Sequence, residues 1–261
     1  MKPLVVLALV LLFSGSGSAA GFLDALGFGT KPDAPKPQIS SAALNALSQD
    51  QVVQGLKEAL SKGLTQAVGK LGHDGGFLTN LNVKIPIPEK MRTIESTLRA
   101  LKQDQYADEF ITTMNRAAEQ AVPAAAPVFV EALQGMTIDD AKSILSGTTN
   151  AATLYFRKAT EAKLTEKFLP IVKAATDKTG VTLAYKQLMA KANPEGALGS
   201  FGSSFLKAAN IDTVDVDSYV TSMALDGLFK MVAEEEKTIR ENPVARTTDL
   251  LQKVFGAIKL P

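Results

Sequence analysis

Residues 105–122 form a predicted helix that carries the side chains best spaced for acid–base chemistry. Residues three or four positions apart share one face of a helix, so Asn115 and Glu119 lie together on one flank of the apolar stripe. Glu109 and Arg116 lie on the adjacent flank. Carboxylates, amides and guanidinium groups can exchange protons or hydrogen bonds with a substrate in general acid–base catalysis. This helix is therefore the first candidate site.

Two more charged side chains lie on other predicted helices, Arg157 on residues 151–179 and Glu235 on residues 215–241. Three interpretations stay open for the polar flanks of the helix 105–122. They are a solvated face, a buried structural network joined by Arg157, and a ligand or catalytic site. The candidate polar cluster consists of Glu109, Asn115, Arg116, Arg157 and Glu235.

Glu235 is unusual because it stands in the apolar stripe of its helix, where an unpaired charge is costly. We therefore predict a structural ion pair, with Arg240 or Arg246 as the nearest cationic partners. Arg240 is also spaced to pair with Glu236, four residues earlier. A functional carboxylate at Glu235 is the alternative.

His73, the only histidine, lies in the glycine-rich turn 72–76. A lone histidine cannot form a histidine-rich metal site, and no serine elbow accompanies it. We interpret His73 as a solvated turn residue, with a general base as the alternative. The glycines of residues 193–204 do not form a phosphate loop, because no Gly-Lys-Ser/Thr follows and no strand precedes them.

An acidic cluster precedes the last long predicted helix and consists of Asp212, Asp215 and Asp217. It departs from a calcium loop, because Tyr219 stands where a further Asp or Asn is needed and the required glycine is missing. Acidic residues stabilise the positive end of a helix, so we predict that Asp215 or Asp217 caps this helix. The sequence therefore assigns no catalytic, cofactor-binding or metal-ligating residue, and no cofactor.

Residues 1–20 have the three-part layout of a secretory signal peptide: Lys2, an apolar run over 4–13, and small residues over 14–20. They predict export, to the periplasm or outside the cell. The apolar run is shorter than the roughly 20 residues of a membrane span, and no later segment reaches that length. The Gly/Pro-rich residues 21–38 then form a predicted flexible tether.

Composition excludes several classes of function. The chain is 46% hydrophobic and 21% charged with a net charge of +1, and it is formally neutral once Lys2 is removed with the leader. Neutrality argues against nucleic-acid binding and against electrostatic docking to anionic lipid. The absence of cysteine excludes a thiol nucleophile, a disulfide framework, a thiolate metal site and the acylated cysteine of a lipoprotein.

Beyond Ile39 the apolar spacing is helical almost throughout, which predicts a compact all-α bundle of about nine or ten helices in one domain, residues 39–261. Ser48 with Gln51, and Thr137 with Asp140, mark helix starts, and residues 84–88 form an extended strut. Pro170 kinks or breaks its helix. The remaining predicted helices are residues 49–71, 88–101, 124–133, 138–145, 181–192 and 247–255.

Several runs resemble the bacterial domain of unknown function 4197 family. They are residues 84–90 (KIPIPEK), 107–119 (ADEFITTMNRAAE), 136–142 (MTIDDAK), 155–157 (YFR), 167–172 (KFLPIV), 224–231 (ALDGLFKM), 234–240 (EEEKTIR) and 242–251 (NPVARTTDLL). Together they cover the chain from about Leu47 to Gly256. The resemblance implies an exported bacterial helical protein and brings no activity, cofactor or catalytic residue.

Three functions are compatible with the sequence. The first is a non-enzymatic binding or scaffold module of the cell envelope, whose partner is another envelope protein or an apolar small molecule held between helices. The second is a periplasmic enzyme that uses the carboxylates and arginines of the candidate polar cluster. The third is a membrane-surface module in which an apolar anchor touches lipid, through Phe22, Leu23, Leu26 and Phe28.

Overall fold

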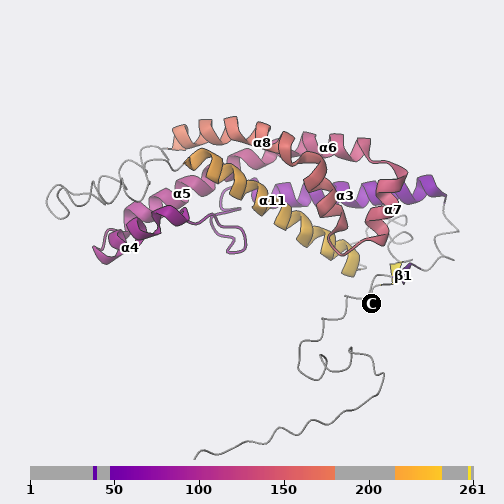
Figure 1. Cartoon of the computed structure of the whole chain (residues 1–261), viewed down its shortest axis with the longest axis horizontal. Coiled ribbons are helices and arrows are strands. Elements are labelled where there is room, and N and C mark those ends of the chain that lie inside the picture. Colours follow the sequence, from indigo (N-terminus) through magenta and orange to yellow (C-terminus); the bar gives the residue numbers. More distant parts are fainter. Residues whose placement is uncertain (1–37, 40–47, 180–214, 243–257, 260–261) are drawn as a thin grey trace, which may run out of the picture. The chain divides into compact units, whose positions relative to one another are not determined.

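The part of the protein that the structure describes consists almost entirely of α-helices, as the sequence predicts. The computed structural model describes residues 38–39, 48–179, 215–242 and 258–259, all within the unit Lys36–Pro261 (Figure 1). Its helices are α3 (Gln49–Leu71), α4 (Arg92–Ala100), α5 (Asp104–Ala121), α6 (Ala125–Gly135), α7 (Ile138–Ser146), α8 (Ala151–Thr179) and α11 (Val216–Glu241). The predicted leader, most of the tether, the helices 181–192 and 247–255 and the loop 193–204 lie outside the described residues. The total of nine or ten helices therefore stays a prediction.

One short β-pair accompanies these helices in the described part of the chain. β1 (Gln38–Ile39) pairs antiparallel with β2 (Ile258–Lys259). An alternating pattern needs about four residues before it can be recognised, so strands of this length leave no signal in the sequence.

The helix starts predicted from local spacing are confirmed. Ser48 accepts a hydrogen bond from the Gln51 N–H at 3.2 Å, and the Gln51 side chain accepts from the Ser48 N–H at 2.9 Å. Thr137 and Asp140 form the same reciprocal pair at the start of α7. Asp215, rather than Asp217, caps α11. These contacts satisfy N–H groups that have no partner within the helix itself.

A loop and an extended segment connect α3 to the rest of the bundle. Gly75, at φ +86°, allows the turn, and Phe77 follows it fully buried. Gly227 of α11 makes room for that ring, since a Cβ there would lie 2.7 Å from it. Residues 84–88, the segment predicted to be extended, form neither a helix nor a strand and lead through the 3₁₀ turn Glu89–Met91 into α4.

α5 ends at the 3₁₀ turn Val122–Ala124, where Pro123 lacks the N–H that would continue the helix, and α6 follows directly. No helix in the described ranges is both long and apolar enough to cross a membrane, in agreement with the sequence. Asp104–Gly135 and Ile138–Ser146 meet the length and composition criteria only together, as a pair bent by 104°.

α8 continues through Pro170 without interruption, so the helix is not broken there, and Figure 1 shows its axis changing direction along its length. α11 packs along α8 in the opposite direction, because Thr153 contacts Glu236 near one end and Thr176 contacts Asp217 near the other. This antiparallel pair positions most of the polar contacts that follow.

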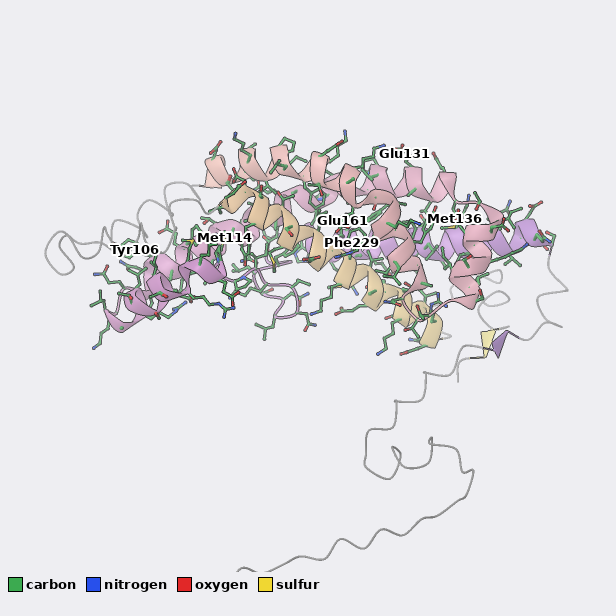
Figure 2. All side chains as sticks on the ribbon, viewed as in Figure 1. Tyr106, Met114, Glu131, Met136, Glu161 and Phe229 are labelled. Atoms are coloured by element: carbon green, nitrogen blue, oxygen red, sulfur yellow. The ribbon has the colours of Figure 1, made fainter. Side chains whose placement is uncertain are left out.

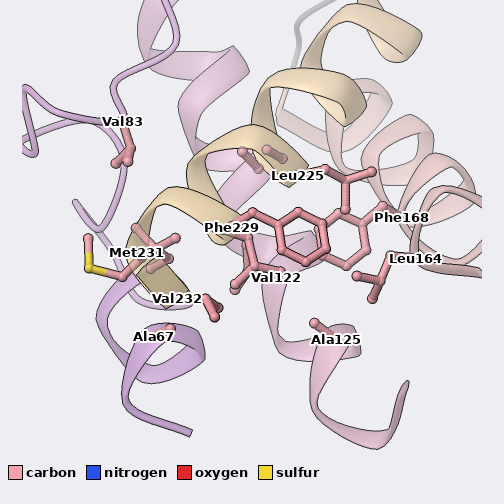
Figure 3. Packing of buried hydrophobic residues seen from close by; sticks show 14 of the residues in the cluster. Ala67, Val83, Val122, Ala125, Leu164, Phe168, Leu225, Phe229, Met231 and Val232 are labelled. Carbon is pink, nitrogen blue, oxygen red and sulfur yellow. The ribbon is translucent and has the colours of Figure 1, made fainter. Parts of the chain in front are cut away.

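The core lies where α8 and α11 meet α3, α5, α6 and the turn Val122–Ala124 (Figure 3). Phe129 of α6 makes edge-to-face contacts with Phe156 of α8 and Phe229 of α11, at centroid distances of 5.8 and 6.3 Å. Such pairs contribute beyond the area they bury. The same figure shows that Phe168 and Leu164 of α8 belong to this buried cluster with Phe229.

Candidate functional site

Asn115 of α5 is fully buried against the extended segment 84–88. Its Nδ2 donates to the carbonyl oxygens of Ile85, at 2.9 Å, and Ile111, at 2.7 Å, and its Oδ1 accepts from the Ile85 N–H at 2.8 Å. The amide therefore satisfies both backbone polar groups of Ile85, much as a neighbouring β-strand would. Asn115 holds the extended segment in place.

Glu119, one turn further along α5, holds the preceding loop. Its Oε1 accepts from the N–H groups of Phe77, at 2.9 Å, and Leu78, at 3.1 Å. Glu119 is buried, and these two donors at close range compensate its charge. Together with Asn115 it fixes the chain between α3 and α4 to α5.

Glu236 of α11 receives the start of α8. Its Oε1 accepts from the Ala152 N–H at 3.0 Å, and its Oε2 accepts from the Thr153 N–H and Oγ1, both at 2.8 Å. A carboxylate at this place also meets the positive end of the α8 dipole. Glu236 thus acts as a cap supplied by another helix.

Arg240 completes this buried contact. Its Nε and one terminal nitrogen donate to Glu236 at 3.0 and 2.8 Å, and that terminal nitrogen also donates to the carbonyl oxygen of Ile144 at 2.9 Å. Glu236 is 5% exposed and Arg240 is 3% exposed. The predicted pairing of Arg240 with Glu236 is confirmed, and it takes Arg240 away from Glu235.

Glu235 is buried, and it pairs with Lys70 of α3, whose side chain is mostly exposed. The prediction of a structural ion pair is confirmed, but the prediction of Arg240 as its partner is wrong. The reason is tertiary: α3 packs against α11 and brings a lysine from far away in the sequence. Arg246 lies outside the described residues.

Arg157 of α8 lies at the partly exposed surface between α8 and α11. It donates to the Asp226 carboxylate at 2.6 Å, and its guanidinium carbon lies 4.9 Å from the centroid of the Phe229 ring. Its distance to the Glu161 carboxylate is longer, 3.7 Å. Arg157 therefore has an ion pair and a cation–π contact on α11, away from Asn115.

The described hydrogen bonds and ion pairs link no two members of the candidate polar cluster. Glu109 and Arg116 are exposed on α5, while Asn115, Arg157 and Glu235 each contact a different part of the protein. His73 is exposed in its turn, as interpreted from the sequence. Within the described residues no three His, Cys, Asp or Glu side chains are grouped so that they could hold a metal ion.

A groove with a volume of about 250 Å³ lies between α8 and α11. α8 contributes Glu161, Thr165 and Leu169, and α11 contributes Ser218, Thr221 and Leu225. Figure 2 shows Glu161 on α8 where that helix passes α11. Thr221 is only 2% exposed, and its Oγ1 has no hydrogen-bond partner among the described residues. Buried hydroxyl groups are rarely left unsatisfied, so this groove contains a polar group that could still bind a ligand.

Two groups at the start of α11 have shifted pKa values. The Ser218 hydroxyl and N–H donate to the Asp215 carboxylate, at 2.6 and 3.0 Å, and lower its pKa below the ordinary value. Burial raises the pKa of Tyr219, whose hydroxyl donates to the carbonyl oxygen of Pro86 at 3.0 Å. Asp215 thus caps α11, and Tyr219 holds the chain at Pro86.

The sequence comparisons place the chain in a family. The family described as "Protein of unknown function (DUF4197)" matches residues 46–256, which include all the side-chain contacts of this candidate site. The chain belongs to this family. No curated protein and no solved structure matches it.

In this DUF4197 protein, sequence reasoning missed the buried roles of Glu119, Glu236 and Arg240 as a set. Glu119 shares the flank of Asn115, so the spacing of these two side chains did point to a common task. The pair of Glu236 and Arg240 had the i, i+4 spacing, but nothing local indicated its burial. The unsatisfied hydroxyl of Thr221 left no signal in the sequence.

Proposed function

We propose that this DUF4197 protein is exported and acts in the cell envelope as a helical binding or scaffold module, without acid–base catalysis. The observation that supports this most strongly is the use of the buried polar side chains. Asn115, Glu119 and Glu236 each hold backbone N–H groups of a segment distant in the sequence. Groups committed in this way stabilise the fold and are not free to exchange protons with a substrate.

The charged candidates support the same proposal. Acid–base catalysis needs two groups that converge on one reacting atom and have separated pKa values. Glu235 pairs with Lys70 at the contact of α3 with α11, whereas Arg157 pairs with Asp226 at the contact of α8 with α11. These contacts belong to different interfaces between helices, which favours structural roles.

Export is supported by the layout of residues 1–20 and tested by fractionation. The full chain is produced in a Gram-negative host, released by osmotic shock and sequenced from its N-terminus. We expect a periplasmic protein that begins at Gly21. The variant Leu9→Arg, which places a charge in the apolar run, is the matched control and is expected to stay uncleaved in the cytoplasm.

Recovery of the unaltered chain, folded and with its N-terminal Met1 in place, from the cytoplasm alone would overturn the proposed export. Equal processing of the parent chain and Leu9→Arg would also count against it, because cleavage would then not depend on the apolar run.

A further inference from the structure

The groove between α8 and α11 is lined mainly by hydrogen-bond acceptors. The Thr165 hydroxyl donates to the carbonyl oxygen of Glu161 at 2.8 Å, and the Ser218 hydroxyl donates to Asp215 at 2.6 Å. A hydroxyl group has one proton, so both oxygens can offer only lone pairs to a ligand. Ser222 and Thr221 add hydroxyl groups that can turn either way.

The Glu161 carboxylate adds a negative charge to this wall. The nearest described cation, Arg157, is 3.7 Å from it and makes its short contact with Asp226 instead, at 2.6 Å. No described residue donates a hydrogen bond to the Glu161 carboxylate. A carboxylate accepts hydrogen bonds and donates none, so a ligand at Glu161 must bring donors.

Thr221 is independent evidence that the groove binds a ligand. It is buried between α8 and α11, it lines the groove, and its Oγ1 has no partner in the described part of the chain. Burial of an unsatisfied hydroxyl is unfavourable, and a hydrogen bond to a ligand would remove that cost.

The apolar part of the lining restricts the ligand further. Leu169 and Leu225 line the groove between the two helices. The volume of about 250 Å³ lies below the roughly 300–1,000 Å³ of pockets that hold drug-sized molecules. The ligand is therefore small, with an apolar stem and a head that donates hydrogen bonds.

We propose that this groove binds a primary alkylammonium group. An ammonium carries three donors, no acceptor and a positive charge, which matches the Glu161 carboxylate and the hydroxyl oxygens of Thr165 and Ser218. The alkyl stem lies against the two leucines. This inference rests on the proposed function as a binding module and names the ligand class. The ammonium belongs either to a free aliphatic amine or to a lysine side chain of another protein.

The test is a calorimetric titration of the full chain after removal of its leader, with pentylamine as the probe and pentanol as the neutral match. We expect saturable binding of pentylamine with a Kd of about 1 mM and binding of pentanol at least about tenfold weaker. Two further probes separate the sources: 1,5-diaminopentane stands for a free amine, and N-acetyl-lysine methylamide stands for a protein side chain.

Variants locate the site. Glu161→Gln is expected to weaken pentylamine binding about tenfold, because it removes the charge and keeps the shape. Thr221→Val is expected to weaken it about fivefold. Glu166→Gln, on the exposed part of the same helix, is the matched control and is expected to change nothing.

Absence of saturable pentylamine binding up to about 10 mM would overturn the inference without any variant, as would equal affinity for pentanol. Equal affinities of Glu161→Gln and Glu166→Gln would place the amine elsewhere and overturn it as well. If the chain is exported but does not bind pentylamine, only the proposed amine site is wrong. If the chain binds pentylamine but is not exported, only the proposed envelope location is wrong.

Discussion

The two ends of the α8–α11 pair differ in the hydrogen bonding of their buried polar atoms. Where α8 begins, Glu236 accepts hydrogen bonds on both oxygens from Ala152, Thr153 and Arg240. Towards the other end, Thr221 is as deeply buried, yet its hydroxyl has no partner among the described residues. The Glu236 carboxylate is therefore saturated with hydrogen bonds, whereas the Thr221 hydroxyl is unsaturated.

This difference separates structural from ligand-binding capacity. A buried polar group is stable when it has hydrogen-bond partners, and the donors to both oxygens of the Glu236 carboxylate meet that condition. Thr221 does not meet it and lies in a groove with acceptor groups. Depth of burial alone cannot distinguish the two cases, but the hydrogen-bond partners can.

The saturated end gives the largest expected effect. Glu236→Leu removes the acceptor of two α8 N–H groups and leaves Arg240 charged and buried. Loss of one partner of a buried ion pair costs about 3–5 kcal/mol, so we expect that decrease in the free energy of unfolding. Urea denaturation followed by circular dichroism measures it.

Its control is Glu234→Gln on the exposed face of α11, which should stay within about 0.5 kcal/mol of the parent chain. The double variant Glu236→Leu/Arg240→Met should recover part of the loss, because no charge is then left buried. A Glu236→Leu variant as stable as Glu234→Gln would show that the contact does not hold α8.

Asn115 makes another saturated polar contact, away from α11. Asn115→Leu leaves the N–H and C=O groups of Ile85 buried without their side-chain partner. We expect a loss of about 2 kcal/mol and faster hydrogen exchange of the Ile85 amide. The exposed Gln120→Leu on the same helix serves as control. Unchanged exchange at Ile85 would mean that another group holds the extended segment.

Contacts between residues close together in the sequence could be predicted, whereas contacts between distant residues could not. The capping pairs of Ser48 with Gln51 and of Thr137 with Asp140 lie three residues apart, so local geometry alone determines them. Arg240 with Glu236 is local too, at four residues. These pairs, and the helices they belong to, were predictable because no distant element decides them.

The contacts that could not be predicted depend on which helices pack together. Glu235 pairs with Lys70, 165 positions away, although Arg240 stands closer in the sequence. Glu109 and Arg116 share one flank of α5 as Asn115 and Glu119 share the next, yet they are exposed, because the loop and the extended segment lie against the flank of Asn115 and Glu119. Periodicity identifies flanks, and only tertiary packing decides which flank is buried.

The cap at the start of α11 gives a smaller and pH-dependent effect. Ser218 lowers the pKa of Asp215 below 3.8, so the ionised cap stabilises the fold at neutral pH, and this stabilisation is lost as the pH falls through the lowered pKa. We expect Asp215→Ala to cost about 1 kcal/mol at pH 7. The difference from the parent chain should disappear below that pKa in urea denaturation at graded pH.

Asp215→Asn is the matched variant, since asparagine caps helices about as well and carries no charge. It should keep most of the stability at pH 7 and remove the part of the acid dependence that Asp215 contributes. A cost of Asp215→Ala that stays constant down to about pH 2, well below the ordinary carboxyl pKa, would contradict the ionised cap.

The smallest expected effect tests the unsaturated end directly, with two threonines that are each 2% exposed. Thr160 donates to the carbonyl oxygen of Phe156 at 2.6 Å, so Thr160→Val loses a hydrogen bond and should cost about 1 kcal/mol. Thr221→Val loses none and removes a buried unsatisfied hydroxyl, so it should be neutral or stabilising by up to about 1 kcal/mol. Urea denaturation of both variants compares them under one condition. Equal losses would mean that the Thr221 hydroxyl has a partner within the chain. A loss of stability in Thr160→Val but not in Thr221→Val would mean that the Thr221 hydroxyl is available to a ligand in the groove.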